Sequence, residues 1–362
     1  MITVMLLGPS LTAVSGVSTH LNQLFQSPLA DEFNLIHFQV GGEGRNETSV
    51  TKLVRLFLSP IQFFAEVVNK RPQIIHLNTS LEQKSYWRDI AYLLIAKALR
   101  KKVVYQVHGG ALPQVFFKNS RFLTKILKWV LLSADVVVLL SQEELHAYQD
   151  FVRDHNLKVI PNAIEIGEDA HWKVDPSLQN KPLQLIYVGR LAEVKGIFQI
   201  IEALAFVRAR GRDIRLVIAG SGPDMKKLQA IVNDKNLNAY ASFAGAVYGE
   251  EKDRLWREAD LFVFPTYHRE GLPYAVLESM AARTPPIVSP VGAIPDVMED
   301  GVHGYFVPSR DPKALAEIIE RLDDDRALIR KMGQACRERI ENYYTVIRLA
   351  EDFRNLYRNL MK

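Results

Sequence analysis

Short apolar runs alternate with longer stretches of helical periodicity along this chain. Ile2 to Leu7 predicts a buried strand, and Val17 to Gln26 predicts the helix that follows it. Further strands are expected at 35–40, 74–77, 103–107, 136–140, 158–160, 185–188, 215–219, 242–244, 261–264, 286–289 and 304–307. Strands that alternate with helices in this way indicate parallel α/β architecture.

Helical patterns fill the intervals between the strands. Helices are expected at 86–99, 121–132, 142–151, 250–258, 314–322, 325–341 and 346–360 and after the strands at 185–188 and 215–219. A helix at 52–70 is expected to be interrupted near Pro60, because proline removes a backbone N–H.

The pattern stops once and then restarts, which predicts two similar Rossmann-like units. Residues 166–181 lack clear periodicity and are interpreted as a linker. The expected organisation is therefore a first unit at 1–165, the linker, a second unit at 182–342 and a final amphipathic helix within 343–362.

Composition indicates a soluble globular protein. The 362 residues are 48% hydrophobic and 24% charged, which is typical of folded domains. The single Cys336 allows no intramolecular disulfide and suggests a reducing compartment. The first residues lack the basic start of a signal peptide, and no apolar run reaches the roughly 18 residues of a membrane span. We therefore expect a cytoplasmic protein.

The net charge of +4 lies entirely in the first unit. Residues 1–165 hold 17 Lys and Arg against 13 Asp and Glu, so they account for the whole excess. Residues 90–134 contain eight basic residues and no acidic one. This pattern fits an ordinary solvated face, and it equally fits attraction to an anionic membrane or acceptor.

Basic and aromatic residues gather on the helix expected at 121–132. Lys118, Arg121, Lys125 and Lys128 form one stripe, and Phe122, Ile126 and either Trp129 or Val130 form another. An interfacial helix has this pattern, and so does a domain helix with a basic outer face. The candidate contacts to an acceptor or a membrane are Phe117, Lys118, Arg121, Lys125 and Lys128.

Two loops of the second unit carry candidate anion-binding residues. Arg190 and Lys195 follow Gly189 in the loop between a strand and a helix, where two cations suit a diphosphate. The alternative is a pair of exposed surface cations. Gly220 and Ser221 belong to a second tight turn, which is a weaker signal because many α/β turns look alike.

Two carboxylates flank the start of another helix. Glu270 lies in the loop before Pro273, which is expected at the first helical position, and Glu278 lies one to two turns inside the helix. The pair could be surface carboxylates, a general acid and base, or ligands for sugar hydroxyls.

His108 is the one histidine whose context suggests a site. It ends an apolar strand and precedes two glycines, whereas His20, His76 and the remaining histidines are interpreted as structural. Gly16, in a loop after the first strand, either marks a helix N-terminus that faces a ligand or belongs to a flexible loop. Residues 323–325 are three aspartates, which we interpret as a helix-capping turn, so no metal site is expected.

Together these motifs resemble retaining glycosyltransferases of family 4, which have the GT-B fold. The resemblance covers essentially the whole chain and is densest from Val188 to Val307. Its most specific part is a glutamate, seven residues and a second glutamate, which here are Glu270 and Glu278. The resemblance implies two Rossmann-like doubly wound domains that face a cleft, with the final helix crossing back to the first domain.

The resemblance also implies a role for each candidate residue. Arg190 and Lys195 would hold the donor diphosphate, Glu278 the ribose and Glu270 the transferred sugar. Further donor contacts would come from Gly16, Gly189, Gly220, Ser221 and the amides of Gly271 and Leu272. His108 would lie near the sugar, so the catalytic set would be His108, Arg190, Lys195 and Glu270.

The implied activity is metal-independent transfer of a hexose from a nucleotide diphosphate sugar. The acceptor would be a glycan or a lipid-linked precursor, with peripheral contact to the inner membrane face, no further cofactor and no nucleic acid. Two departures from the family pattern are Ser15 in place of a first glycine and Pro273 in place of a glycine. A nucleotide-sugar 2-epimerase of the same fold and a non-catalytic binding subunit stay open as alternatives.

Overall fold

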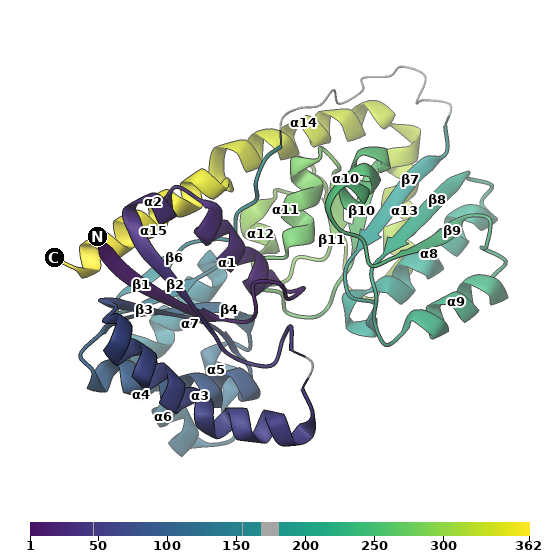
Figure 1. The fold of residues 1–362 in the computed structure, drawn as a ribbon. Coiled ribbons are helices and arrows are strands. Elements are labelled where there is room, and N and C mark those ends of the chain that lie inside the picture. The colour runs from purple at the N-terminus through teal and green to yellow at the C-terminus, as the bar shows by residue number, and fades with distance from the viewer. Residues whose placement is uncertain (46, 154, 168–180) are drawn as a thin grey trace. The chain divides into compact units, whose positions relative to one another are not determined.

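The computed structural model describes residues 1–45, 47–153, 155–167 and 181–362. The linker expected at 166–181 therefore lies almost wholly outside the described residues. Unit 1 comprises Met1–Glu165, Glu270–Leu272 and Tyr344–Lys362, and unit 2 comprises Ile166–Arg269 and Pro273–Tyr343. Each unit contains one sheet with helices packed on it (Figure 1).

Unit 1 is built on a parallel sheet of six strands in the order β2-β1-β3-β4-β5-β6. The strands are β1 (Ile2–Gly8), β2 (Phe33–Gln39), β3 (Ile74–Leu81), β4 (Lys102–Gly110), β5 (Val136–Leu139) and β6 (Leu157–Val159). β1 pairs with β2 from Ile2↔Phe33 onward and with β3 from Val4↔Ile74 onward. The chain order reverses between β1 and β3, so a topological switch point lies there.

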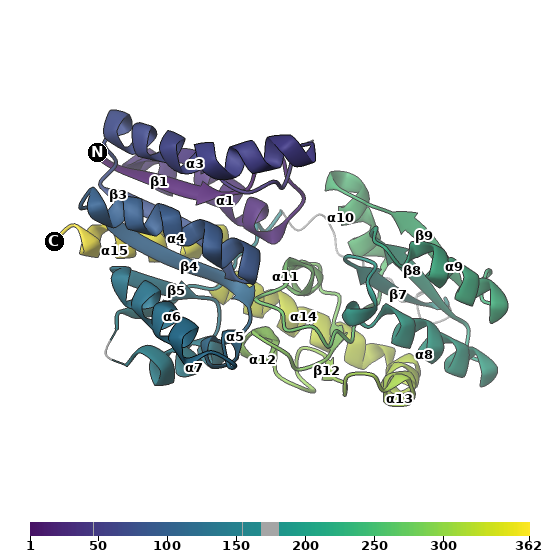
Figure 2. The same cartoon turned by 90° about the horizontal axis from the view of Figure 1, so that it is seen from below.

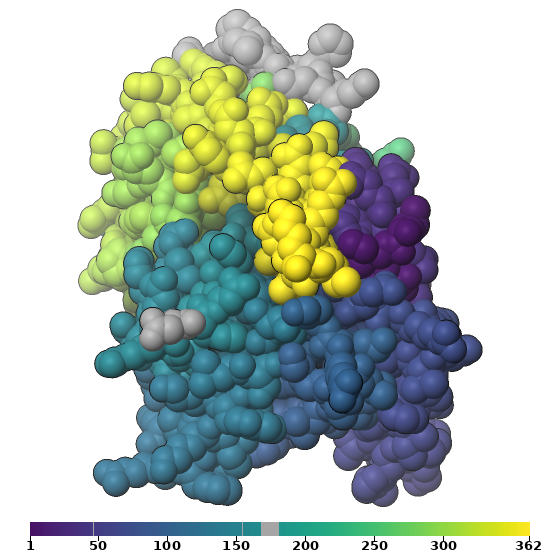
Figure 3. All heavy atoms as spheres, turned by 90° about the vertical axis from the view of Figure 1, so that its left-hand side faces the viewer, coloured from purple at the N-terminus to yellow at the C-terminus, as the bar shows by residue number. Residues whose placement is uncertain are grey.

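Helices cover both faces of this sheet. One face carries α3 (Ser49–Lys70), α4 (Gln83–Ala98), α5 (Pro113–Phe116), α6 (Arg121–Ser133) and α7 (Gln142–Val152). The other carries α1 (Gly16–Gln26), α2 (Leu29–Glu32) and α15 (Val346–Leu360). Leu349, Phe353 and Tyr357 of α15 are buried in the core of this second face. Figure 3 shows the yellow end of the chain lying on the residues of unit 1.

The expected interruption of the third helix is absent. α3 runs unbroken for 22 residues with Pro60 inside it. The side chain of Ser59 hydrogen-bonds Tyr92 of α4 at 2.8 Å, and Phe63 and Val67 are buried one and two turns later. These contacts hold the helix on its course even though Pro60 removes one backbone donor.

Unit 2 is built on a second parallel six-stranded sheet in the order β12-β11-β10-β7-β8-β9. The strands are β7 (Leu183–Val188), β8 (Ile214–Ala219), β9 (Ala241–Gly245), β10 (Leu261–Phe264), β11 (Pro286–Val288) and β12 (Tyr305–Phe306). The helices are α8 (Ile197–Ala209), α9 (Met225–Asp234), α10 (Gly249–Glu258), α11 (Tyr274–Ala281), α12 (Ile294–Val297), α13 (Pro312–Asp324) and α14 (Arg326–Tyr343). Its switch point lies between β7 and β10.

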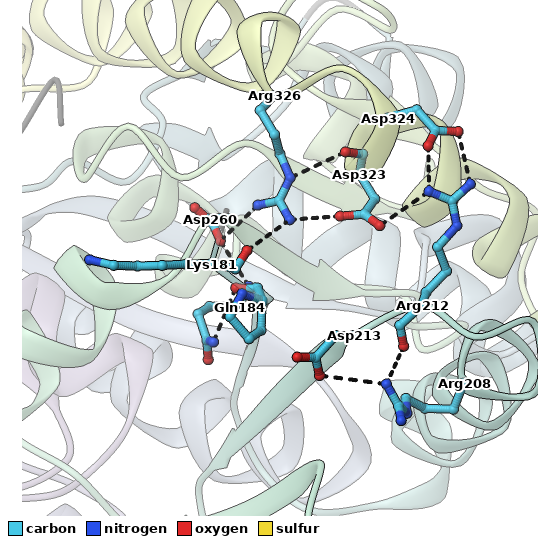
Figure 4. A network of polar contacts seen from close by, with 10 residues as sticks. Lys181, Gln184, Arg208, Arg212, Asp213, Asp260, Asp323, Asp324 and Arg326 are labelled. Atoms are coloured by element: carbon cyan, nitrogen blue, oxygen red, sulfur yellow. Dashed lines mark hydrogen bonds and ion pairs between the residues drawn. The ribbon is translucent and has the colours of Figure 1, made fainter. Parts of the chain in front are cut away.

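Two of the three consecutive aspartates form ion pairs within unit 2, and the third caps a helix. Asp325 accepts a hydrogen bond from the Leu328 amide at 3.0 Å at the start of α14. Asp323 pairs with Arg326 at 2.6 Å, and both Asp323 and Asp324 pair with Arg212 (Figure 4). The interpretation as a capping turn therefore holds for Asp325 alone, because the other two lie in the last turn of α13.

Candidate functional site

The loops at the carboxyl ends of β7, β8 and β10 interlock around the switch point of unit 2. A Cβ added at Gly220 would overlap the carbonyl oxygen of Gly189, and one at Gly222 would overlap that of Leu191. Gly196, with φ of +78°, packs in the same way on the carbonyl of Pro265. These glycines are thus explained by close packing of backbones, which weakens Gly220 and Gly222 as a phosphate signature.

The segment that holds Lys195 is fixed from two sides. Asp224 accepts a hydrogen bond from the Glu193 amide at 2.7 Å. The Val194 carbonyl accepts from the amides of Tyr267 at 3.0 Å and His268 at 3.2 Å, in the loop after β10. A loop held at both ends keeps its side chains in place, which a binding site requires.

The two cations of this loop lie between β7 and α8 in the chain. Arg190 is exposed, and the Lys195 ammonium lies 5.8 Å from the centre of the Phe264 ring. α8 begins after Gly196, which has no side chain to cap the first amides. An uncapped helix start two residues after Lys195 is a favourable environment for an anion.

Glu278 lies on α11 and is already paired in unit 2. Its carboxylate accepts from the Lys252 ammonium at 2.7 Å and from the Trp256 indole at 3.3 Å, both on α10. Pro273 was expected to be the first helical residue. Instead it is the N-cap residue of α11, with extended backbone, and the helix begins at Tyr274. The pKa of the neighbouring Tyr274 is raised by burial and by the charge of Glu278.

In unit 1, His108 does not end its strand. β4 continues through Gly110 because Leu81 of β3 pairs with that residue, and His108 is half-buried. Its Nε2 donates to Asn78 Oδ1 at 2.9 Å, since the Asn78 amide nitrogen itself donates to the Leu7 carbonyl. Burial lowers the pKa of His108 well below its usual value, so the ring is neutral at pH 7.

Two further histidines lie behind His108, and sequence reasoning assigned neither to the site. The ring of His20, on α1, is 4.8 Å from that of His108 and fully buried. His76 of β3 donates through Nε2 to Gln106 and accepts at Nδ1 from the hydroxyl of Tyr357 on α15, at 2.9 and 2.6 Å. Burial lowers the pKa of His20 to about 4 and that of His76 to about 3.

Among the described residues, both ring nitrogens of His20 and the amide nitrogen of Gln106 lack a hydrogen-bond partner. The three atoms are buried donors or acceptors in one neighbourhood, and such groups are costly to leave unpaired. The sequence around His20 does not indicate that it lies near His108, because the two rings meet only when α1 packs on the sheet.

The segment Glu270–Leu272 belongs to unit 1 and lies on the end of β4. A Cβ at Gly271 would come within 2.8 Å of the His108 carbonyl oxygen, and one at Gly109, with φ of +105°, within 2.9 Å of the Gly271 amide nitrogen. The Leu272 carbonyl accepts from the side chain of Asn162 at 2.8 Å. The structure therefore brings together His108 and Glu270–Leu272, whereas Glu278 is part of the other unit.

Gly16 opens α1. The side chain of the preceding Ser15 accepts from the Ser18 amide at 3.3 Å, so this helix start carries a side-chain cap. Ser15 thus has a structural role at the position where the family pattern has a glycine.

The basic residues of α6 are exposed, but some of the apolar residues considered with them are not at the surface. Arg121, Lys125 and Lys128 are exposed, as are Phe122 and Trp129. Phe117 is buried and packs on Tyr86, Phe116 and Trp87, so it is not part of the exposed face. Val130 is buried and Ile126 packs partly into the core. The exposed face therefore pairs the lysines with Phe122 and Trp129.

The chain matches two family models that are adjacent and together cover most of its length. Residues 27–168 match Glycosyltransferase Family 4, and residues 169–339 match Glycosyl transferases group 1. The chain belongs to this family of glycosyltransferases, and its two parallel six-stranded units have the GT-B fold.

Individual relatives match over shorter stretches. The alpha-D-kanosaminyltransferase of Streptomyces kanamyceticus is 30% identical over 51% of this chain and 47% of its own length. The amylovoran biosynthesis glycosyltransferase AmsK of Erwinia amylovora is 31% identical over 46% of this chain and 42% of its own length. The chain thus spans less than half the length of either relative.

A solved structure matches along the whole chain. HepE of Anabaena, crystallised with UDP-glucose, superposes with a TM-score of 0.78 at 17% identity and covers 99% of this chain and 100% of that one. At this identity the match shows the fold alone.

Proposed function

We propose that this glycosyltransferase moves a hexose from a nucleotide diphosphate sugar to a polysaccharide precursor or lipid-linked acceptor, with retention at the anomeric carbon. The observation that carries the proposal is the loop of Arg190 and Lys195, which is held rigid beside the uncapped start of α8. The complex of HepE with UDP-glucose supports a nucleotide sugar as the donor.

In the proposed reaction the diphosphate is bound by cations and backbone amides. Arg190 and Lys195 stabilise the negative charge that develops as the bond from the sugar to the phosphate breaks. The departing diphosphate takes the acceptor proton on the same face, so no protein carboxylate acts as nucleophile. Because the cations carry this role, we propose that the reaction needs no metal ion.

The carboxylates and His108 position the sugar in this proposal. Glu278 accepts hydrogen bonds from the ribose hydroxyls, and its present partners Lys252 and Trp256 hold it in one orientation. Glu270 and the amides of Gly271 and Leu272 bind the hexose next to His108, on which Gly271 already packs. Because its pKa is lowered, the neutral ring of His108 is a weak base. It can therefore hydrogen-bond sugar hydroxyls without taking up a proton.

Two observations support a polysaccharide or lipid-linked acceptor. AmsK is by its name an enzyme of amylovoran biosynthesis. The exposed cations of α6 would attract the phosphates of a lipid-linked acceptor or of an anionic membrane. The structure also shows that, in the part of the chain it describes, no helix is long and apolar enough to cross a membrane.

A donor screen tests the proposal. The protein is incubated with each of a set of uridine, guanosine and adenosine diphosphate sugars, and release of the nucleotide is measured with and without excess EDTA. We expect slow release from one donor, unaffected by EDTA. The configuration of the product made with an added acceptor glycan then tests retention.

Each other outcome contradicts a defined part of the proposal. Formation of a 2-epimer of the donor without release of its sugar would instead indicate an epimerase. Binding of a donor without turnover, even with acceptor, would indicate a non-catalytic subunit. An inverted product would overturn the retaining mechanism, and loss of activity in EDTA would overturn metal independence.

A further inference from the structure

The most extensive exposed apolar surface of unit 1 lies on α3. Val50, Leu53, Phe57, Ile61, Phe64 and Val68 are all exposed and follow one another at intervals of three or four residues. Such spacing places them on one face of the helix, and we call these six residues the outer stripe.

The outer stripe is distinct from the face that packs on the sheet. The buried residues of α3 are Ser59, Phe63 and Val67, which form a separate row at intervals of four. Arg55 continues the buried row by one turn toward the N-terminus and forms an ion pair with Glu47 at 2.8 Å. A surface helix of a globular protein normally has one apolar stripe that faces the core, so a second and longer one is unusual.

The N-terminal half of α3 is not stabilised by packing on the rest of unit 1. None of the residues 49–58 is buried, although Val54, Leu56 and Leu58 add three more exposed apolar side chains. The side chain of Thr48 caps the helix by accepting from the Thr51 amide. Isolated helices of this length are marginal, so a partner that covers the stripe would stabilise this half.

The helices beside α3 also carry exposed apolar side chains. Figure 2 shows α3, α4 and α6 in one layer in front of the sheet, and α4 contacts both of the others. On α4 the exposed apolar residues are Trp87 and Leu94, and on α6 they are Phe122, Trp129 and Leu132. Exposed apolar side chains therefore lie on three helices of one layer.

The charges on these three helices are mainly positive. α3 carries Lys52, Arg55 and Lys70 against Glu66, α4 carries Lys84, Arg88 and Lys97 against Asp89, and α6 carries Arg121, Lys125 and Lys128 with no acidic residue. A second copy of the chain would bring like charges together across the contact, which disfavours self-association. A basic face with exposed aromatic and aliphatic residues instead suits a surface of anionic lipid.

We infer that α3 lies in the interface of an anionic lipid bilayer, with the outer stripe inserted among the acyl chains and the cations of α6 on the phosphates. This inference extends the proposed acceptor, because it brings unit 1 to the membrane where a lipid-linked acceptor would reside. It does not depend on the transfer reaction, since lipid binding needs no donor.

Flotation with vesicles tests the inference. The full-length protein is mixed at 0.1 M NaCl with vesicles of phosphatidylglycerol and phosphatidylcholine, or of phosphatidylcholine alone. We expect the wild type to float with the anionic vesicles. The triple variant Leu53→Gln/Phe57→Gln/Ile61→Gln should partition at least about 100-fold less, because three inserted apolar side chains are lost.

The chain offers a matched control for a single substitution. Ile61 on α3 and Ile347 on α15 are each 65% exposed, but they lie on helices that cover opposite faces of the sheet. Ile61→Gln should weaken vesicle binding about tenfold, whereas Ile347→Gln should leave it unchanged. Both variants should retain wild-type circular dichroism and donor hydrolysis, which shows that they are folded.

The cations provide an independent readout. Lys125→Gln/Lys128→Gln should weaken binding to anionic vesicles by about 30-fold at low salt, at roughly 1 kcal/mol per charge. Added salt should reduce this difference. The inference is overturned if the wild type stays with the soluble fraction, or if Ile61→Gln and Ile347→Gln behave alike. It is also overturned if the wild type is a dimer that the triple variant converts to a monomer, because the stripe would then bind a second copy.

Discussion

The two units have parallel sheets of equal strand number, yet the chemistry at their strand ends differs. In unit 2 the switch point between β7 and β10 carries Arg190 and Lys195 on loops locked by backbone packing. In unit 1, His108 lies two residues before the end of β4 and is backed by the buried, neutral histidines His20 and His76. The comparison teaches that the same sheet architecture can present cations on its loops in one unit and bury neutral histidines behind its strand ends in the other.

The difference fits a division of labour in the proposed reaction. A leaving diphosphate needs fixed positive charge, which the loop of unit 2 supplies. A sugar is uncharged, so in the proposal unit 1 offers it hydrogen-bonding groups (the Glu270 carboxylate, two backbone amides and the neutral ring of His108) and no cation. Each of the following predictions would break or sharpen this contrast.

The largest effect is expected at Lys195. Lys195→Ala should lower the rate of nucleotide release by on the order of 10²-fold, because one fixed cation at the departing phosphate is lost. Lys227→Ala is the matched control, since Lys227 lies over Phe198 at 4.6 Å as Lys195 lies near Phe264, but on α9. Near-normal turnover of Lys195→Ala would contradict the proposal that this loop of unit 2 stabilises the departing diphosphate.

The locking of the loops predicts an effect on stability. Gly220→Ala should destabilise unit 2 by about 2 kcal/mol more than Gly211→Ala, because only the first added methyl group meets a backbone carbonyl. Both glycines have positive φ, and the space around Gly211 is open. Urea midpoints of the two variants measure the difference, and equal midpoints would show that the contact between the loops of Gly189 and Gly220 is not tight.

The buried histidines of unit 1 predict a dependence of stability on pH. Because the pKa of His20 is about 4 when folded and 6.5 is its ordinary value, the unfolded chain binds a proton first as the pH falls. Folding stability should therefore decrease from pH 7 to pH 5, by about 2 kcal/mol for this one ring.

Substitution of His20 isolates that contribution. In His20→Leu the loss of stability between pH 7 and pH 5 should be smaller by the same amount, as measured by hydrogen exchange at the amides of β3 and β4. The exposed His146 on α7 provides the control, and His146→Leu should keep the wild-type dependence. An unchanged dependence in His20→Leu would mean that His20 is charged or hydrated in the fold.

The smallest effect is expected at Glu278. Glu278→Gln should raise KM for the donor about tenfold with little change in kcat, since a charged hydrogen bond to the ribose becomes a neutral one. Glu258→Gln is the control, because Glu258 on α10 pairs with Arg254 and is exposed. A fall in kcat with unchanged KM would move Glu278 from binding to the chemical step.

The sequence predicts best what depends on neighbouring residues. The strand Leu261–Phe264 and the helix Val346–Leu360 have the expected bounds, because each carries a complete local pattern. The resemblance brought Glu270 and Glu278 together as one signature, but their surroundings differ, since Glu270 rests on β4 and Glu278 on α10. Contacts between distant segments leave no mark in local spacing.

Other features escaped prediction for reasons of packing. Pro60 suggested a break, but Ser59 and Phe63 anchor α3 on either side of it. Phe117 had the right chemistry for a surface contact and is buried because Tyr86 and Phe116 enclose it. The proximity of His20 to His108 was equally invisible, since the two residues are 88 positions apart and meet only when α1 packs on the sheet.

The place of α15 has a consequence for how the chain folds during synthesis. Domains usually fold as they emerge, the N-terminal one first. Here the sheet of unit 1 has one face covered in part by Leu349, Phe353 and Tyr357, which are translated after all of unit 2. On the ribosome, unit 2 can therefore complete its core first. Until α15 has been synthesised, part of one apolar face of the unit 1 sheet stays exposed to solvent.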